Sequence, residues 1–165
     1  MNIRKAKSSD VQGITKVHVE SWKTTYKGIF PKDFLDSINF DKRLKLWQSV
    51  LSKKDEIVYV IENNNRIVGF ISGGPAREEK FEKDGEIYAF YILEEHQNKG
   101  LGKKLLNKFF NDLKEKKHNS AYVWVLKDNP AVEFYKKMGA IEIKEEEIEI
   151  AKNKYKEVAY GWDHL

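Results

Sequence analysis

Apolar residues in the first third of the chain follow a helical spacing. Between residues 10 and 26 they recur every three to four positions behind a serine and aspartate cap, which predicts a helix. A second helical stretch follows Pro31 and includes Leu35, and a third runs from about residue 41 to residue 51. A short strand candidate at residues 2–6 precedes them, so the first third is predicted to be mainly helical.

The middle of the chain changes to strand-like patterns. Residues 56–63 and 66–74 are β-rich and flank a turn of asparagines, which predicts a hairpin. The charged segment 76–85 is predicted to be a loop. Residues 86–93 follow as a run of mainly apolar and aromatic side chains, which is typical of a central strand buried on both faces.

The second half of the chain alternates helices and strands. An apolar stripe with helical periodicity predicts an amphipathic helix that ends near Lys117. A strand at residues 120–126 follows, and then a short helix with Asn129 at its N-cap, Pro130 in its first turn and Gly139 just past its end. The stripe consists of Leu101, Leu105, Leu106, Phe109, Phe110 and Leu113.

Two further β-rich runs, at residues 140–150 and 156–165, close the chain. The order is strand, helices, hairpin, long strand, helix, strand, short helix and two strands. This order predicts an α/β fold of the α+β type, with helices packed around one mixed sheet. We expect a single domain that spans residues 1–165.

Composition narrows the possible chemistry. The 165 residues include no cysteine, which excludes disulfides, thiolate zinc sites and cysteine nucleophiles. The four histidines lack metal-ligand spacing, so we expect no metal. The formal net charge of +4 is compatible with an anionic ligand, but interspersed charges and few arginines disfavour nucleic acid. Without a signal-peptide core or a membrane-spanning run, we expect no membrane association and a cytoplasmic location.

The segment "EEHQNKGLGKKLL", residues 94–106, combines glycines and lysines at a predicted helix start. A glycine inside a helix costs about 1 kcal/mol relative to alanine, and lysines in the first turn oppose the helix dipole. Both become favourable if an anion binds there, because glycines expose N–H groups and lysines neutralise charge. The alternative is a tight turn followed by an ordinary solvated helix face.

Two motifs resemble one known family. "QNKGLG", residues 97–102, is similar to the [Q/R]-x-x-G-x-[G/A] signature of the GCN5-related N-acetyltransferase (GNAT) superfamily, and "NPAVEFYKKMGA", residues 129–140, resembles its downstream segment. The N-terminal segment "SWKTTYKGIFPKDFLDS" also looks like small bacterial members. The resemblance covers nearly the whole chain and implies the GNAT-like fold, with a mixed, mostly antiparallel central sheet.

The resemblance implies that acetyl-coenzyme A (acetyl-CoA) is the co-substrate. Its pyrophosphate is expected on the backbone amides of residues 98–103, and its pantetheine arm beside the end of the long strand and the short helix. Cofactor-binding candidates are therefore Tyr91, Ile92, Leu93, Gln97, Asn98, Lys99, Gly100, Leu101, Gly102, Lys103, Asn129, Phe134 and Tyr135. Asn129 has a second reading as a helix cap alone.

The resemblance also suggests catalytic residues. Tyr135 matches the family tyrosine that protonates the departing thiolate, although it could instead be a core aromatic. Glu86 is the candidate general base, since strand alternation places it on one face with Tyr88, Phe90 and Ile92; a solvated carboxylate is the alternative. Substrate-binding candidates are Trp22, Tyr26 and Tyr88, and His18 on the first predicted helix could also line the acceptor cleft.

These observations lead to one main function and two alternatives. The main expectation is an N-acetyltransferase that moves acetyl from acetyl-CoA to a primary amine of a small molecule or peptide by direct attack on the thioester. A coenzyme-A-binding sensor without turnover is one alternative, and a basic nucleic-acid-binding module is the other. The oligomeric state is open between a monomer and a homodimer.

Overall fold

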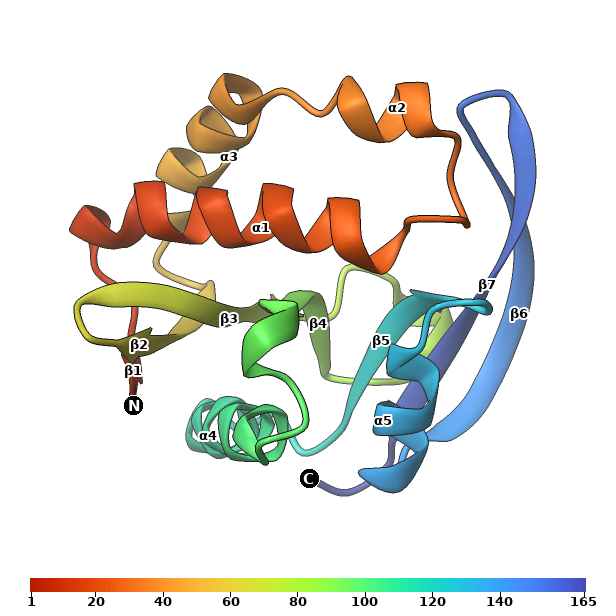
Figure 1. Ribbon diagram of the computed structural model, residues 1–165. Helices are drawn as coiled ribbons and strands as arrows, with labels where there is room; N and C mark the ends of the chain where they lie inside the picture. The colour runs from red at the N-terminus through yellow and green to blue at the C-terminus, as the bar shows by residue number, and fades with distance from the viewer.

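A computed structural model describes the whole chain, residues 1–165. All strands belong to one seven-stranded sheet in the order β1-β2-β3-β4-β5-β7-β6 (Figure 1). Every neighbouring pair is antiparallel except β4 with β5, which confirms the predicted mixed, mostly antiparallel sheet. The strands are β1 (Asn2–Lys5), β2 (Ile57–Asn63), β3 (Arg66–Pro75), β4 (Gly85–Ile92), β5 (Ala121–Leu126), β6 (Ile141–Ile150) and β7 (Asn153–Trp162).

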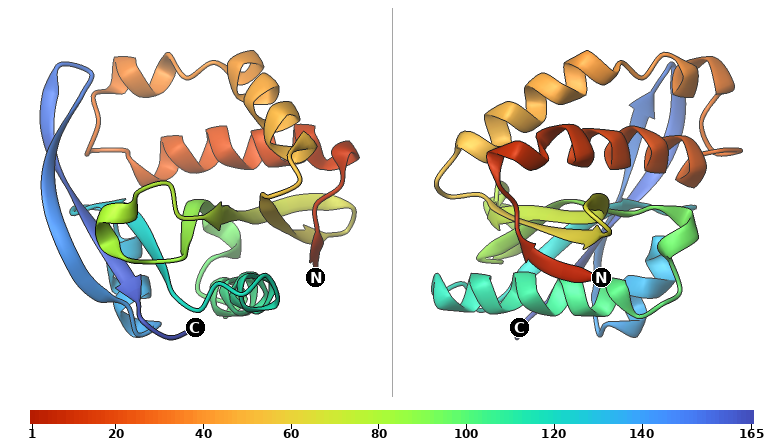
Figure 2. Two further views of the ribbon diagram at one scale, coloured as in Figure 1. Left: turned by 180° about the vertical axis from the view of Figure 1, so that it is seen from behind. Right: turned by 60° about the vertical axis from the view of Figure 1, so that its left-hand side comes forward.

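The helices cover both faces of this sheet. One layer holds α1 (Val11–Thr25), α2 (Lys32–Asp36) and α3 (Phe40–Ser52), and the opposite layer holds α4 (Leu101–Glu115) and α5 (Ala131–Lys137) (Figures 1 and 2). Three short 3-10 helices complete the structure: η1 (Ser8–Asp10), η2 (Glu79–Phe81) and η3 (Glu94–His96). No helix is both long and apolar enough to cross a membrane.

Local sequence signals account for several element boundaries. The predicted stripe of α4 is buried over its full length, from Leu101 to Leu113, and packs against β2 and β3. The Asn129 side chain accepts a hydrogen bond from the Ala131 N–H at 2.9 Å, and Gly139 follows α5 with a φ of 85°. These observations confirm the predicted limits of the short helix, because a left-handed residue after a helix favours glycine.

The strand β4 is not buried on both faces throughout, as the sequence suggested. Gly85 to Ile87 are buried and pair with β5, whereas Tyr88 to Ile92 are only half-buried. The ladder with β5 ends at the Ile87–Val123 pair, and beyond it the two strands diverge. The second half of β4 therefore has β3 as its only strand neighbour.

A β-bulge in β4 also overturns the predicted alternation. Ser72 pairs with Ala89 and Gly73 with Ile87, which leaves Tyr88 as an extra residue. Glu86 and Tyr88 both contact the Arg77 side chain, but Phe90 packs on Phe134 of α5. The expectation that Phe90 and Ile92 share a face with Glu86 was therefore wrong, because one inserted residue reverses the side of all that follow.

The hairpin of β6 and β7 extends past the rest of the sheet and lies beside α2 (Figures 1 and 2). Tyr155 of β7 contacts Phe30 of the α1–α2 loop edge-on, with 5.0 Å between ring centroids. Phe30 belongs to a small apolar cluster with Tyr26, Leu35 and Leu126, separate from the main core. This second cluster closes the sheet on the side where β4 and β5 diverge.

Candidate active site

A cavity of about 180 Å³ lies where β4 and β5 diverge. The second halves of the two strands, Tyr88 to Tyr91 and Val123 to Leu126, line it from the sheet. Asn129, Ala131 and Tyr135 line it from the start of α5 and the preceding loop. Diverging parallel strands leave room for a ligand beside their backbone, so this cavity is the candidate active site.

Elements distant in the sequence close the cavity on its other side. Trp22 and Tyr26 come from the end of α1, and Phe30 from the following loop. Ile148, Ile150 and Glu157 come from the β6–β7 hairpin. Asn129 and Glu157 are the polar members of a lining that is otherwise apolar or aromatic.

Tyr135 is 5 % exposed, and its ring lies edge-on to Phe134 and Trp162. Burial raises the pKa of its phenol above the ordinary value of 10, and the nearby Tyr26 hydroxyl adds to this rise. No hydrogen bond within the chain engages the Tyr135 hydroxyl. The phenol therefore stays protonated at neutral pH and is available as a donor inside the cavity.

Three further polar groups form a chain in the cavity. The Tyr26 hydroxyl lies 3.3 Å from the Tyr91 hydroxyl, and the Asn129 amide donates to Tyr26 at 3.5 Å. Burial raises the pKa of both Tyr26 and Tyr91, so these phenols also stay protonated. Asn129 thus caps α5 with its oxygen and reaches the cavity with its nitrogen.

Trp22 and Tyr26, both predicted to contact substrate, do line the cavity, whereas His18 does not. The His18 ring stacks on Tyr91 with centroids 5.4 Å apart, and its Nδ1 accepts a hydrogen bond from the Trp47 indole at 3.0 Å. Burial lowers the pKa of His18 to about 3, with a smaller effect from Arg43. A neutral histidine therefore supports β4 from behind the cavity.

The helix start at residues 98–103 has an unusual number of free donors. None of the six backbone N–H groups from Asn98 to Lys103 donates to an acceptor in the chain. Asn98 and Gly100 both have left-handed backbones, with φ of 57° and 71°. Left-handed residues just before a helix start direct several N–H groups to one place and create a positive potential there. A phosphate group binds at such a place, because it accepts hydrogen bonds and is negatively charged.

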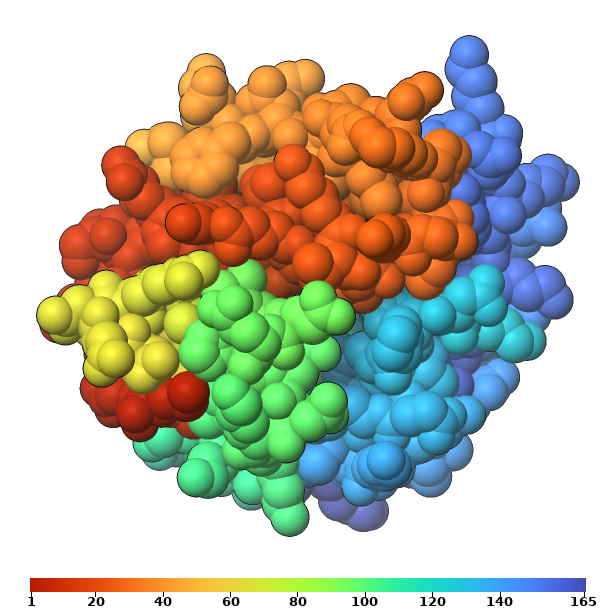
Figure 3. Space-filling view, in the orientation of Figure 1, coloured from red at the N-terminus to blue at the C-terminus, as the bar shows by residue number.

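The glycines of this segment have different local roles. A Cβ on Gly100 would meet no atom within 4 Å, so its space is open and its positive φ is the reason for glycine. A Cβ on Gly102 would lie 3.1 Å from the Phe134 ring, so this glycine allows α4 to approach α5. In Figure 3 the segment before α4, in green, and the segment that contains α5, in blue, lie next to each other on the surface below α1.

At the end of β4, some backbone N–H groups point into the space where β4 and β5 diverge. Leu93 donates its N–H to Val68, toward the β3 side, and backbone directions alternate along a strand. The N–H groups of Phe90 and Ile92 therefore point away from β3, while those of Tyr91 and Leu93 point toward it. Of the three residues expected to pair with the cofactor arm, Ile92 has the suitable direction, and Phe90 is an additional candidate.

The free donors, the diverging strands and the buried tyrosine agree with one family. A family model described as the acetyltransferase (GNAT) family matches residues 18–140. The chain belongs to this family. The uncharacterized N-acetyltransferase YuaI of Bacillus subtilis is 40% identical over 166 residues, which cover 100% of this chain and 94% of that protein.

Solved structures of acetyltransferases share the GNAT fold seen here. The PaiA N-acetyltransferase of Thermoplasma acidophilum, in complex with coenzyme A, superposes with a TM-score of 0.73 at 24% identity, over 94% of this chain and 96% of that one. The YncA protein of Salmonella typhimurium, solved with acetyl-CoA, gives a TM-score of 0.75 at 20% identity, over 98% of this chain and 92% of that one.

The GNAT chain described here has no group of three or more His, Cys, Asp or Glu side chains that could hold a metal ion.

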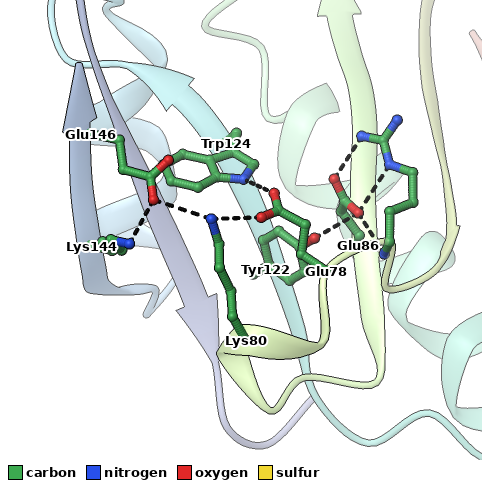
Figure 4. A network of polar contacts seen from close by, with 8 residues as sticks. Glu78, Lys80, Glu86, Tyr122, Trp124, Lys144 and Glu146 are labelled. Carbon is green, nitrogen blue, oxygen red and sulfur yellow. Dashed lines mark hydrogen bonds and ion pairs between the residues drawn. The ribbon is translucent and has the colours of Figure 1, made fainter. Parts of the chain in front are cut away.

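Glu86, the expected general base, lies outside the cavity lining and is 2 % exposed. Its carboxylate accepts hydrogen bonds from the backbone and guanidinium of Arg77, at 2.6 to 3.1 Å, and from the Tyr122 hydroxyl at 2.7 Å (Figure 4). A general base needs a free lone pair within reach of the amine. This geometry disfavours Glu86 as the base and favours a role in joining β4 to β5.

Tyr88, a predicted substrate contact, lines the cavity, and its hydroxyl donates to the Pro75 carbonyl at 2.5 Å.

Three other lining residues were not predicted from the sequence: Phe30, Trp124 and Glu157. Glu157 alternates with Val158 along β7, so the sequence indicates only that its side chain lies opposite the buried face. Its position in the cavity depends on pairing with Leu126 of β5, which no local signal encodes.

Proposed function

We propose that this protein acts as a single N-acetyltransferase domain over residues 1–165 and transfers acetyl from acetyl-CoA to a primary amine of a small molecule or peptide. The observation that carries this proposal is the cavity at the β4–β5 divergence, which holds the protonated Tyr135 beside unpaired strand backbone. Acetyl-CoA supplies a thioester whose carbonyl carbon is attacked by the amine. The sequence expectations of a cytoplasmic location and of a monomer or homodimer stay predictions.

The residues at the start of α4 suit the phosphates of the donor. The N–H groups of residues 98–103 bind the pyrophosphate, and Lys99 and Lys103 contribute positive charge. The Gln97 side chain donates to the Ile92 carbonyl at 2.8 Å, which fixes this loop to the end of β4. Phe134, which faces Gly102, forms the neighbouring wall for the donor.

The residues along β4 and α5 suit the thioester end of acetyl-CoA, where the reaction takes place. The outward N–H groups of Phe90 and Ile92 orient the donor and can polarise its carbonyl oxygen. Tyr135 gives its phenolic proton to the sulfur as the C–S bond breaks, and the proton that the amine nitrogen loses on forming the C–N bond replaces it on the phenol. Asn129 and Tyr26 hold their polar atoms toward the same space and help to orient the acceptor.

The test is a thiol-release assay with acetyl-CoA and a panel of primary amines. Loss of the Tyr135 proton donor in Tyr135→Phe should reduce kcat by about 100-fold, while calorimetry should give an unchanged Kd for coenzyme A. Tyr160→Phe is the matched control, because Tyr160 is equally buried but lies outside the cavity lining. Tight coenzyme A binding without turnover of any amine would instead identify a coenzyme-A-binding protein without catalysis.

A further inference from the structure

Glu157 is the charged member of the cavity lining, and its carboxylate has no partner. In β7 it pairs with Leu126 of β5 on one side and with Glu146 of β6 on the other. It lines the same cavity as Trp22, Tyr26 and Tyr135. No hydrogen bond or ion pair within the chain engages its oxygens. A half-buried carboxylate between apolar walls is therefore left uncompensated.

The neighbouring carboxylates differ in this respect (Figure 4). Glu78 accepts a hydrogen bond from the Trp124 indole at 2.8 Å and pairs with Lys80 at 2.6 Å. Glu146 pairs with Lys80 at 3.1 Å and with Lys144 at 2.6 Å. Lys80 and Lys144 are thus engaged by Glu78 and Glu146, and neither forms an ion pair with Glu157.

This arrangement is costly without a cation. Burial raises the pKa of Glu157, and the negative charges of Glu146 on β6 and Glu78 before η2 raise it further, while Lys80 opposes them. A carboxylate in such surroundings gains from any cation that enters the cavity, because the cation restores the lost solvation and reduces the repulsion. The ammonium group of a primary amine has the required charge and three donors.

The rest of this wall is apolar and aromatic. Trp22, Tyr26 and Phe30 pack around one another with ring centroids 4.8 to 5.9 Å apart. Ile148 and Ile150 complete the wall on the hairpin. Such a surface stabilises an apolar body by removing it from water, and the cavity lining includes no lysine or arginine to pair with a carboxylate or phosphate on the ligand.

We propose that Glu157 binds the ammonium group of the acceptor, and that the aromatic wall selects a small amine with an apolar or aromatic body and no negative charge. This inference rests on the proposed acetyltransferase function and specifies its acceptor. The bound ammonium group releases one proton to solvent, and the neutral amine that results is the nucleophile that attacks the thioester. Glu157 is then a specificity-determining residue, separate from Tyr135, and the donor cradle at residues 98–103 is independent of it.

The experiment uses 2-phenylethylamine as acceptor and compares the wild type with Glu157→Gln and Glu147→Gln. Glutamine keeps the shape of Glu157 but not its charge, and Glu147 is a matched control that is exposed on β6 and paired only with Lys154. We expect Glu157→Gln to raise the KM for the amine by roughly 10- to 100-fold, the value of a charged hydrogen bond. The KM for acetyl-CoA should stay within about twofold in both variants.

A second measurement separates loss of charge from loss of shape. 2-Phenylethanol has the same apolar body without the ammonium group and should inhibit competitively against the amine. Its inhibition constant should be the same for the wild type and Glu157→Gln, which also shows that the variant is folded. A parallel loss of affinity for the alcohol and the amine would overturn the inference, because it would indicate a damaged cavity rather than a lost ion pair.

The remaining outcomes distinguish this inference from the function on which it rests. An unchanged KM for 2-phenylethylamine in Glu157→Gln would remove Glu157 from acceptor binding, while turnover by the wild type would uphold acetyl transfer. Turnover of only polar or anionic amines would overturn the proposed acceptor class and leave acetyl transfer intact. Failure to bind acetyl-CoA in calorimetry, together with no turnover, would reject the proposed function itself.

Discussion

The two halves of β4 have opposite surroundings although one strand contains both. Residues 85–87 are buried, pair with β3 and β5, and include Glu86 with its bonds to Arg77 and Tyr122. Residues 88–92 have only β3 as a strand neighbour, and Tyr88 to Tyr91 line the cavity. The first half therefore contributes stability, and the second half leaves backbone and side-chain groups available to ligands.

The transition between the halves occurs at the Tyr88 bulge. An extra residue in one strand increases the local twist and disturbs the ladder, so the end of β4 turns away from β5. Phe90 then faces α5, and Tyr91 faces α1 through its stack on His18. Position along this strand therefore determines whether a side chain stabilises the sheet or contacts a ligand.

The largest expected effect is the loss of the Glu86 bonds in the first half. Glu86→Ala should lower the free energy of unfolding by about 3 kcal/mol, because it leaves the buried Tyr122 hydroxyl without an acceptor and Arg77 without its partner. Urea unfolding followed by circular dichroism measures this change.

The control for Glu86 is Glu79→Ala, in an exposed residue of the same loop region, which should change stability by less than about 0.5 kcal/mol. If Glu86→Ala kept full stability but lost turnover, the assignment of stability to the first half of β4 and of ligand contacts to the second half would be wrong. Glu86 would then act in the reaction rather than in the pairing of β4 with β5.

The second half depends on His18, which supports Tyr91. Its folded pKa of about 3 lies below the ordinary 6.5, so between these values the unfolded chain binds the proton more readily. The stability from neutral His18 is fully present above pH 6.5 and is lost as pH falls toward 3. We expect a loss of about 2 kcal/mol between pH 6.5 and 4.5, measured by urea unfolding at several pH values.

His18→Gln should flatten this pH dependence, because glutamine does not titrate and can still accept from the Trp47 indole. His164→Gln is the matched control, since His164 is exposed near the C-terminus and should leave the curve unchanged. An equally steep fall in His18→Gln would assign the acid sensitivity to other groups and remove His18 as the support of the second half.

Features with a local cause were predictable from the sequence. The stripe of α4, the hairpin of β2 and β3 with left-handed Asn64 and Asn65, and the limits of α5 all follow from periodicity or turn chemistry. The glycine and lysine segment before α4 was also recognisable, because its residues are unfavourable for a helix unless an anion binds. The two family motifs are also short, local stretches of sequence, and their resemblance to the GNAT family identified acetyl-CoA as the donor.

Features that depend on tertiary pairing were not predictable. The alternation of Glu86, Tyr88 and Phe90 failed because the bulge arises from the register with β3. The cavity position of Glu157 depends on its pairing with Leu126, and its free charge depends on how Lys80 is shared between Glu78 and Glu146. Acceptor recognition is therefore encoded in contacts between distant segments, whereas donor recognition is encoded in a short motif.

The smallest expected effect distinguishes the donor cradle from backbone strain. Gly100 and Gly28 both have a positive φ, 71° and 82°, and a Cβ on either would meet no atom within 4 Å. Alanine should therefore cost about 1 kcal/mol of stability at either position. Only Gly100 lies among the free N–H groups, so only Gly100→Ala should weaken coenzyme A binding, by about tenfold (1.4 kcal/mol), in calorimetry.

Gly102 is less suitable than Gly100 for this substitution, because a Cβ there would also displace Phe134. An equal loss of affinity in Gly28→Ala would show that general strain, rather than the residue 98–103 cradle, determines how tightly the donor binds.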